Sequence, residues 1–218
     1  AVKLMQKVPN NQIFYANLDK LIDNSSLYHS KLLFELLDIR NQIENVPLML
    51  LLYQQTNDER IKTLIQKSFL ANHEVSSWIS LVTSILVEDT LQYSIRPSTE
   101  IKKLMITITK MLVNRIREMY PFNVMYIDKI INISFELLKH KKWKQKGLSI
   151  LSVIIDSFIN TEEISLIYQR IQSYEEQIIN LFNTLKSFVQ FHKIFFSLFR
   201  LYLKLNNENK MILIEKAN

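Results

Sequence analysis

The sequence predicts an all-α protein, and three features of its 218 residues support this prediction. Glycine occurs once, at Gly147, whereas average usage would give roughly 15 in a chain of this length. Only four prolines interrupt the chain. Apolar residues recur at steps of three and four along most of it, which is typical of amphipathic helices. Because tight hairpins need residues that adopt a positive φ, a chain so poor in glycine favours helices over sheets.

About ten helices are expected. Their predicted ranges are 11–23, 26–43, 46–55, 58–71, 74–93, 97–119, 122–139, 145–159, 161–187 and 189–205, with a short addition at 208–216. Favoured N-cap residues, Asn24-Ser25-Ser26, precede the second helix. Pro47, Pro97 and Pro121 are expected in first turns, where a missing N–H costs least.

The helix expected at 97–119 shows the periodicity well. Its apolar stripe consists of Ile101, Leu104, Met105, Ile108, Met111, Leu112, Ile116 and Met119. Lys103, Lys110 and Arg117 follow one another at seven-residue steps and are expected on the opposite face, toward water. The start of the helix at 161–187 carries Glu162 and Glu163, which complement the positive end of the helix dipole.

Successive helices can be paired into units that begin near residues 11, 46, 74, 121 and 161, a spacing close to helix-pair repeats. In these helix lengths and short loops the chain resembles the HEAT and armadillo families of α-helical repeat proteins. The resemblance implies an α-solenoid of stacked helix pairs, and the alternative is an irregular helical bundle. We expect one helical-repeat domain over residues 1–218, as a fragment of a longer protein.

The composition excludes the common glycine-dependent catalytic motifs. Dinucleotide fingerprints, P-loops and nucleophile elbows all need several glycines. The four histidines, His29, His73, His140 and His192, show no metal-ligand spacing, and adjacent carboxylates on a helix diverge by about 100°. We therefore expect no enzyme activity, no cofactor, no metal and no small-molecule substrate. The longest uncharged stretches are about 13 residues, too short to span a bilayer.

Positive charge is concentrated in one part of the chain. Residues 101–150 hold 11 Lys and Arg against 3 Asp and Glu, whereas the preceding 100 residues hold 9 against 11. The densest run lies between two expected helices. The predicted anion-binding or acidic-partner residues are Lys103, Lys110, Arg117, Lys139, Lys141, Lys142, Trp143, Lys144 and Lys146. Trp143 is either a flat face for a base or cation, or an anchor in the core. Solvated lysines that cap a helix are the alternative for the whole patch.

The end of the chain is rich in phenylalanine. The helix at 189–205 is apolar nearly all round, so it must be enclosed, either as core or by a following repeat or partner. The residues of this possible apolar interface are Phe195, Phe196, Phe199 and Tyr202.

These features favour a non-catalytic scaffold and protein–protein interaction module of an intracellular assembly. Its partners would be other protein subunits that offer helical or acidic segments to the basic region at 101–150. The alternative is a helical-repeat domain that binds RNA or DNA. The absence of cysteine fits a reducing compartment, the nucleus or the cytoplasm, and we expect a eukaryotic protein.

Overall fold

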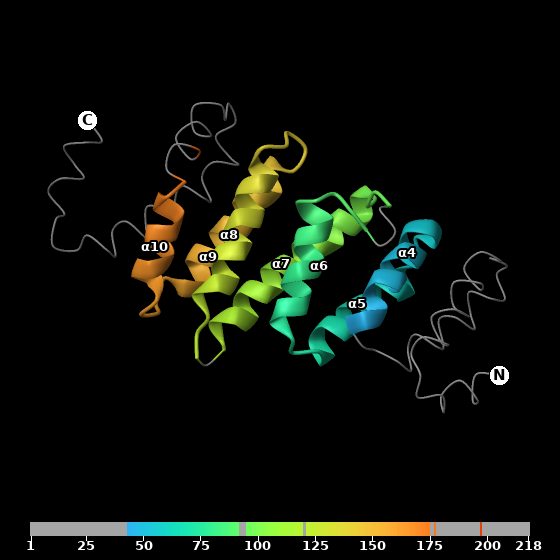
Figure 1. Ribbon diagram of the computed structural model, residues 1–218, viewed down its shortest axis with the longest axis horizontal. Coiled ribbons are helices and arrows are strands. Elements are labelled where there is room, and N and C mark those ends of the chain that lie inside the picture. The colour runs from blue at the N-terminus through green and yellow to red at the C-terminus, as the bar shows by residue number, and fades with distance from the viewer. Residues whose placement is uncertain (1–42, 92–94, 120, 175–176, 178–196, 198–218) are drawn as a thin grey trace, which may run out of the picture. The chain divides into compact units, whose positions relative to one another are not determined.

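A computed structural model of the chain describes residues 43–91, 95–119, 121–174, 177 and 197 (Figure 1). These residues form one 3₁₀ turn, η1, and seven α-helices, α4 to α10, and contain no strand. The predicted all-α class is therefore confirmed for this part of the chain. The helices expected at 11–23 and 208–216, that at 189–205 apart from Ser197, and that at 26–43 apart from its last residue lie outside the described residues.

The chain divides into two compact units. The first unit contains the described residues up to Ile85 and those from Asp89 to Leu104. The second contains Leu86–Glu88 and the described residues from Met105 onward.

The first unit begins with η1 (Ile43–Asn45), α4 (Val46–Thr56) and α5 (Glu59–Ala71), and α4 packs against α5. Pro47 lies in the first turn of α4, as expected. A tight connection follows, in which Asn57 is left-handed (φ 53°) and the Asp58 side chain accepts a hydrogen bond of 2.9 Å from the Arg60 N–H. This cap satisfies one of the N–H groups that have no partner within the helix.

The helix α6 (Val75–Leu86) adds the largest side chain to the core of the first unit. Trp78 is fully buried and contacts the ring of Phe69 on α5, with the centroids 5.1 Å apart and the planes at 74°. Such edge-to-face pairs are favourable beyond the area they bury. The indole N–H has no hydrogen-bond acceptor among the described residues, so packing is what holds this ring in the core.

The expectation of a helix over 74–93 is wrong at its end, because α6 stops at Leu86. Asp89 adopts a left-handed conformation (φ 56°), which a helix cannot continue through. The Ser84 hydroxyl donates to the Thr90 carbonyl over 3.0 Å, and the Thr90 N–H donates to the Ser84 carbonyl over 3.0 Å. These bonds fold the chain back at the end of α6.

The Asp89 carboxylate connects this turn to the start of α7 (Thr99–Arg117). It accepts a hydrogen bond of 2.7 Å from Arg96 Nε and forms an ion pair with Lys102 on α7. Burial acts to raise the pKa of Asp89, but the hydrogen bonds and charges of Lys102 and Arg96 outweigh it and lower the pKa. Pro97 lies two residues before α7, in the connection, and not in the first turn as expected.

The second unit contains α7 from Met105, α8 (Val124–Leu138), α9 (Lys144–Phe158) and α10 (Ile164–Gln172). Asn123 caps α8 by accepting a hydrogen bond of 3.0 Å from the Met125 N–H. Pro121 lies three residues before α8, outside its first turn. The helix expected at 161–187 begins later, and α10 ends at Gln172; beyond Tyr174, only Gln177 of the expected range is among the described residues. At the end of α10, the Ser173 hydroxyl donates to the Arg170 carbonyl over 2.7 Å, and serine bonds of this kind compete with helix continuation.

Alternate helices of the second unit run parallel. Lys110 Nζ on α7 donates to Ser149 Oγ on α9 over 2.6 Å. One turn further along α7, Asn114 Oδ1 accepts a hydrogen bond of 3.0 Å from the hydroxyl of Ser157, which lies about two turns further along α9. Residue numbers therefore increase in the same direction along α7 and α9.

The helices α8 and α10 are parallel for the same reason. Arg170 pairs with Asp128 at 3.3 Å, and the ring of Tyr174, just after α10, stacks on Phe135 at a centroid distance of 4.0 Å. The second unit therefore alternates in direction from α7 to α10.

Gly147 sets the distance between α8 and α9. It is buried on α9, and a Cβ atom at this position would lie 2.6 Å from the carbonyl oxygen of Ser134 and 3.0 Å from Leu138 Cδ2, both on α8. Real Cβ atoms essentially never approach a backbone atom so closely. The only glycine of the chain is therefore a packing residue, and it allows two helix backbones to meet.

We expect Gly147→Ala to lower the free energy of unfolding by about 2 kcal/mol, because the backbone of α8 must move to admit the methyl group. In an exposed helix the same change would stabilise by about 1 kcal/mol. Urea unfolding followed by circular dichroism measures the difference, with Gln145→Ala, an exposed position of α9, as the control. A stabilised Gly147→Ala variant would contradict the close approach.

Acid should weaken the Asp89 connection. The folded-state pKa of Asp89 is lowered, so its contribution to stability is present above the unfolded value of about 3.9 and is lost as the pH falls through the folded pKa. Asp89→Asn should lower the free energy of unfolding by about 1 kcal/mol at neutral pH. Below about pH 4, the free energy of unfolding of the variant should decrease less with falling pH than that of the original chain. Denaturant melts across this pH range test the expectation against Glu162→Gln, an exposed carboxylate control. Identical pH profiles for Asp89→Asn and the unmodified chain would contradict it.

Candidate functional site

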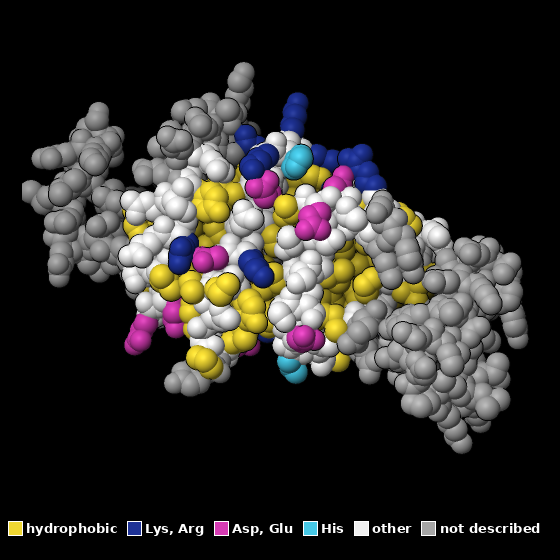
Figure 2. Space-filling view, viewed as in Figure 1, with side chains coloured by type: hydrophobic (Ala, Val, Ile, Leu, Met, Phe, Trp, Pro, Cys, Tyr) yellow, Lys and Arg dark blue, Asp and Glu magenta, His cyan; other side chains and the backbone are white. Residues whose placement is uncertain are grey.

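The dense basic run covers the connection between α8 and α9 and the start of α9; we name residues 139–146 the basic turn. Its backbone is largely satisfied internally. The N–H groups of Trp143 and Lys144 both donate to the His140 carbonyl over 2.9 Å, and the N–H of Lys146 donates to the Trp143 carbonyl over 2.9 Å. Lysine side chains, and not backbone amides, are therefore the groups that this turn offers to a partner. Figure 2 shows dark blue side chains projecting at the upper edge, where Figure 1 has the connection between α8 and α9.

Trp143 resolves the alternative that the sequence left open for it. Its side chain is only 9% exposed, and it occupies the N-cap position of α9 without a side-chain cap hydrogen bond. Lys142 Nζ lies 5.3 Å from the ring centroid, within the range of a cation–π contact. The ring is thus an anchor in the core and offers no open face on which a base could stack.

The five lysines of the basic turn differ in what they contact. Lys139 pairs with Glu136, one turn earlier on α8, at 2.6 Å. Lys142 lies over Trp143, and Lys144 is half-buried at the first position of α9. Lys141 and Lys146 are exposed, and no acidic group of the described chain pairs with either. The charge of these two side chains is therefore directed toward solvent.

The start of α9 is electrostatically unfavourable. Its first turn contains Lys144 and Lys146 and no acidic residue. The sequence has no Asp or Glu between Glu136 and Asp156. Cations near the positive end of a helix dipole lower stability by about 0.3–1 kcal/mol each. The basic turn therefore concentrates charge at a place where folding alone would favour a carboxylate.

The three predicted basic residues of α7 have different surroundings. Lys110 is half-buried and donates to Ser149 on α9, so it does not simply point toward water as expected. Because α7 is parallel to α9, with Lys110 beside Ser149 and Asn114 beside Ser157, Arg117 lies about 18–24 Å along the axis from the start of α9, at about 1.5 Å per residue. Arg117 is exposed and pairs with Glu118 at 3.4 Å. Lys103 belongs to the first unit, where it pairs with Glu100 at 2.8 Å.

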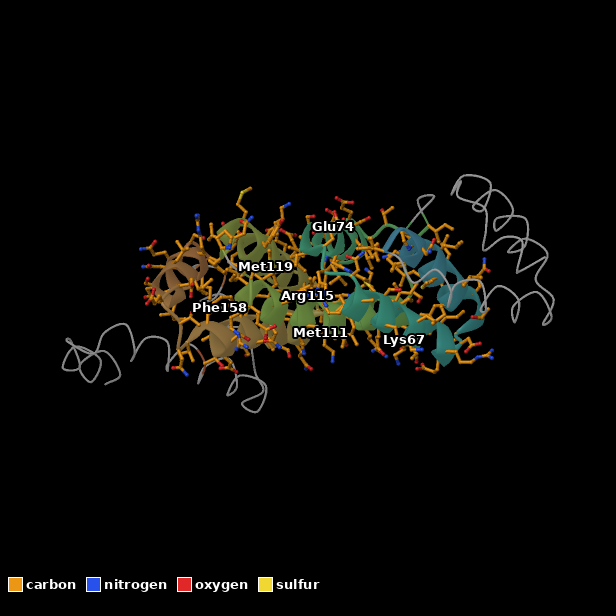
Figure 3. The ribbon with its side chains drawn as sticks, turned by 90° about the horizontal axis from the view of Figure 1, so that it is seen from below. Lys67, Glu74, Met111, Arg115, Met119 and Phe158 are labelled. Atoms are coloured by element: carbon orange, nitrogen blue, oxygen red, sulfur yellow. The ribbon has the colours of Figure 1, made fainter. Side chains whose placement is uncertain are left out.

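A further cation of the second unit, Arg115, is absent from the predicted set. It follows Met111 by one turn on α7 and is half-buried, and Figure 3 labels both residues together with Phe158 of α9. Burial lowers the pKa of Arg115, and the charge of Glu118 acts in the opposite direction. Its position beside the apolar stripe, between Met111 and Met119, is the sequence signal that could have indicated this burial.

The second predicted surface cannot be placed. Phe195, Phe196, Phe199 and Tyr202 lie outside the described residues. Ser197, between them in sequence, is described: it is buried and its hydroxyl donates to Asp156 Oδ1 over 3.1 Å.

Two absences apply to the described residues alone. No group of three or more His, Asp or Glu side chains gathers there in a way that could hold a metal ion. None of the helices seen there combines the length and the apolar composition that crossing a bilayer requires.

Comparison with known proteins gives no assignment. No protein-family model, no curated protein and no solved structure matches this chain. The basic turn is therefore interpreted from its own geometry.

The charge at the start of α9 generates a stability prediction. Lys146→Glu should raise the free energy of unfolding by about 0.5–1 kcal/mol, because it replaces a repulsive interaction with the helix dipole by an attractive one. Thermal melts at low salt measure the change. Lys129→Glu, an exposed position in the middle of α8, is the matched charge reversal and should have a smaller effect. A less stable Lys146→Glu variant would contradict this account of the turn.

Proposed function

We propose that this chain is a non-catalytic protein-interaction module that captures acidic segments of other protein subunits through the basic turn. The observation that carries the proposal is the concentration of lysines at 139–146, two of them exposed and without an acidic partner in the described chain. Clustered positive charge of this kind steers and orients partners of opposite charge. The basic turn is the contact, and the packed helices hold it in place.

The proposed scaffold is an α-solenoid similar to HEAT and armadillo repeats. Two findings in the second unit support this arrangement: α7 is parallel to α9, and α8 is parallel to α10. In solenoids each repeat contributes two antiparallel helices, and equivalent helices of successive repeats stack in parallel. A scaffold of this type keeps loops at fixed positions, which suits a module in a nuclear or cytoplasmic assembly.

Nucleic acid is the second candidate partner, and two observations make it weaker than acidic protein. Single strands are bound by combining a basic groove with aromatic faces on which bases stack, but the Trp143 ring is buried. The basic turn also lacks arginine, the side chain that matches phosphate with a planar pair of donors. A lysine ammonium is a point charge, and it suits separate carboxylates as well as it suits phosphates.

Charge reversal in the basic turn tests the proposed function. The triple variant Lys141→Glu, Lys142→Glu and Lys144→Glu should bind a fluorescent peptide of about ten glutamates at least about tenfold more weakly, since the attraction becomes repulsion. Fluorescence anisotropy at low salt gives the dissociation constants, and circular dichroism checks that the variant is folded.

A control with the same change in net charge is Lys67→Glu, Lys103→Glu and Lys129→Glu, three exposed lysines elsewhere. It should retain most of the affinity. If the peptide binds the basic-turn variant as tightly as the original chain, then the turn is not the contact. If an oligouridine of about twenty nucleotides binds the original chain much more tightly than the peptide does, the nucleic-acid candidate replaces this one.

A further inference from the structure

We infer that Lys141 and Lys146 are the residues that contact the acidic partner, and that Lys139 and Lys142 serve the fold of the turn. This inference rests on the proposed function and assigns roles to four of the five lysines of the basic turn; the half-buried Lys144 is in neither group. The partner chemistry that fits is a polypeptide segment with several carboxylates close together in sequence.

The lysines that serve the fold are engaged within the chain. Lys139 follows the last residue of α8, where a cation complements the negative end of the helix dipole, and it pairs with Glu136 at 2.6 Å. The ammonium of Lys142 lies 5.3 Å from the centroid of the buried Trp143 ring. A partner that recruited either ammonium would have to replace an existing interaction.

The contact lysines have the opposite surroundings. Lys141 and Lys146 are both exposed, and no ion pair or side-chain hydrogen bond is seen for either within the described residues. Lys146 also lies in the first turn of α9, where its charge opposes the helix dipole. A carboxylate bound beside Lys146 would remove this repulsion, so partner binding and the local stability of α9 are coupled.

The backbone of the turn argues for side-chain recognition. Amide groups at the start of α9 donate to the carbonyls of His140 and Trp143, so a compact anion has few amides to bind there. Lysine ammoniums on flexible stems form single contacts with separate carboxylates. A segment that places several carboxylates along its length is therefore a better match than a single phosphate.

Two double variants test the inference, and each removes two charges. Lys141→Gln with Lys146→Gln should weaken binding of the glutamate peptide by about tenfold and should reduce its dependence on salt. Lys139→Gln with Lys142→Gln should weaken it by less than about threefold. Anisotropy titrations at several salt concentrations give both quantities, and circular dichroism confirms that each variant is folded.

The outcomes separate this inference from the proposed function. Equal losses in the two variants would overturn the division of the lysines while leaving the basic turn as the contact. A larger loss for Lys139→Gln with Lys142→Gln would also overturn it. No binding of the peptide to the original chain would overturn the proposed function itself. As an independent check, saturating peptide should cancel the stability difference between the original chain and Lys146→Gln, and a difference that persists would contradict the coupling.

Discussion

The close approach of α9 to α8 at Gly147 is the constraint on which the second unit depends. A side chain at this position would meet the Ser134 carbonyl at 2.6 Å, so only glycine lets the two backbones come so near. With the helices so close, the connection between them is short and folds on itself through the carbonyls of His140 and Trp143. The indole of Trp143 then enters the core, and the lysines around it are left on the outside. The chemistry of the basic turn is thus a consequence of helix packing.

The described helices do not all begin in the same way: the N-cap residues of α4, α9 and α10 make no side-chain cap hydrogen bond. Asp58 caps α5 and Asn123 caps α8 through side-chain oxygens. The start of α9 has Trp143 in place of a cap, and lysines where acidic residues would be stabilising. Sites that bind partners often sacrifice stability in this manner, because the groups needed for binding are not the groups that favour folding.

The sequence sufficed for the helical class and for most helix starts, because these depend on local periodicity and on turn residues. It failed at the end of α6, where the left-handed Asp89 depends on ion pairs with Arg96 and Lys102. It placed Lys103 and Arg117 toward water, where they are exposed, but it also placed Lys110 there. A seven-residue spacing gives a shared helix face, but it does not reveal that Ser149 of α9 lies beside Lys110. The alternatives for Trp143 were likewise undecidable without the packing of α8 on α9.

The direction of the helices separates the basic turn from the carboxylates of the second unit that follow α7 and α9. Because α7 and α9 are parallel, the connections that follow them lie at the same end, away from the basic turn. These connections contain Glu118, Glu162 and Glu163, whereas the other end contains the lysines of residues 139–146. Arg115 and Arg117 in the last turn of α7 offset these carboxylates, so the far end is close to neutral and the basic turn is strongly positive. Under the proposed function, an acidic segment would be drawn toward one end only. Orientation of a partner would then arise from the alternation of the helices, which brings charges distant in sequence to a common end.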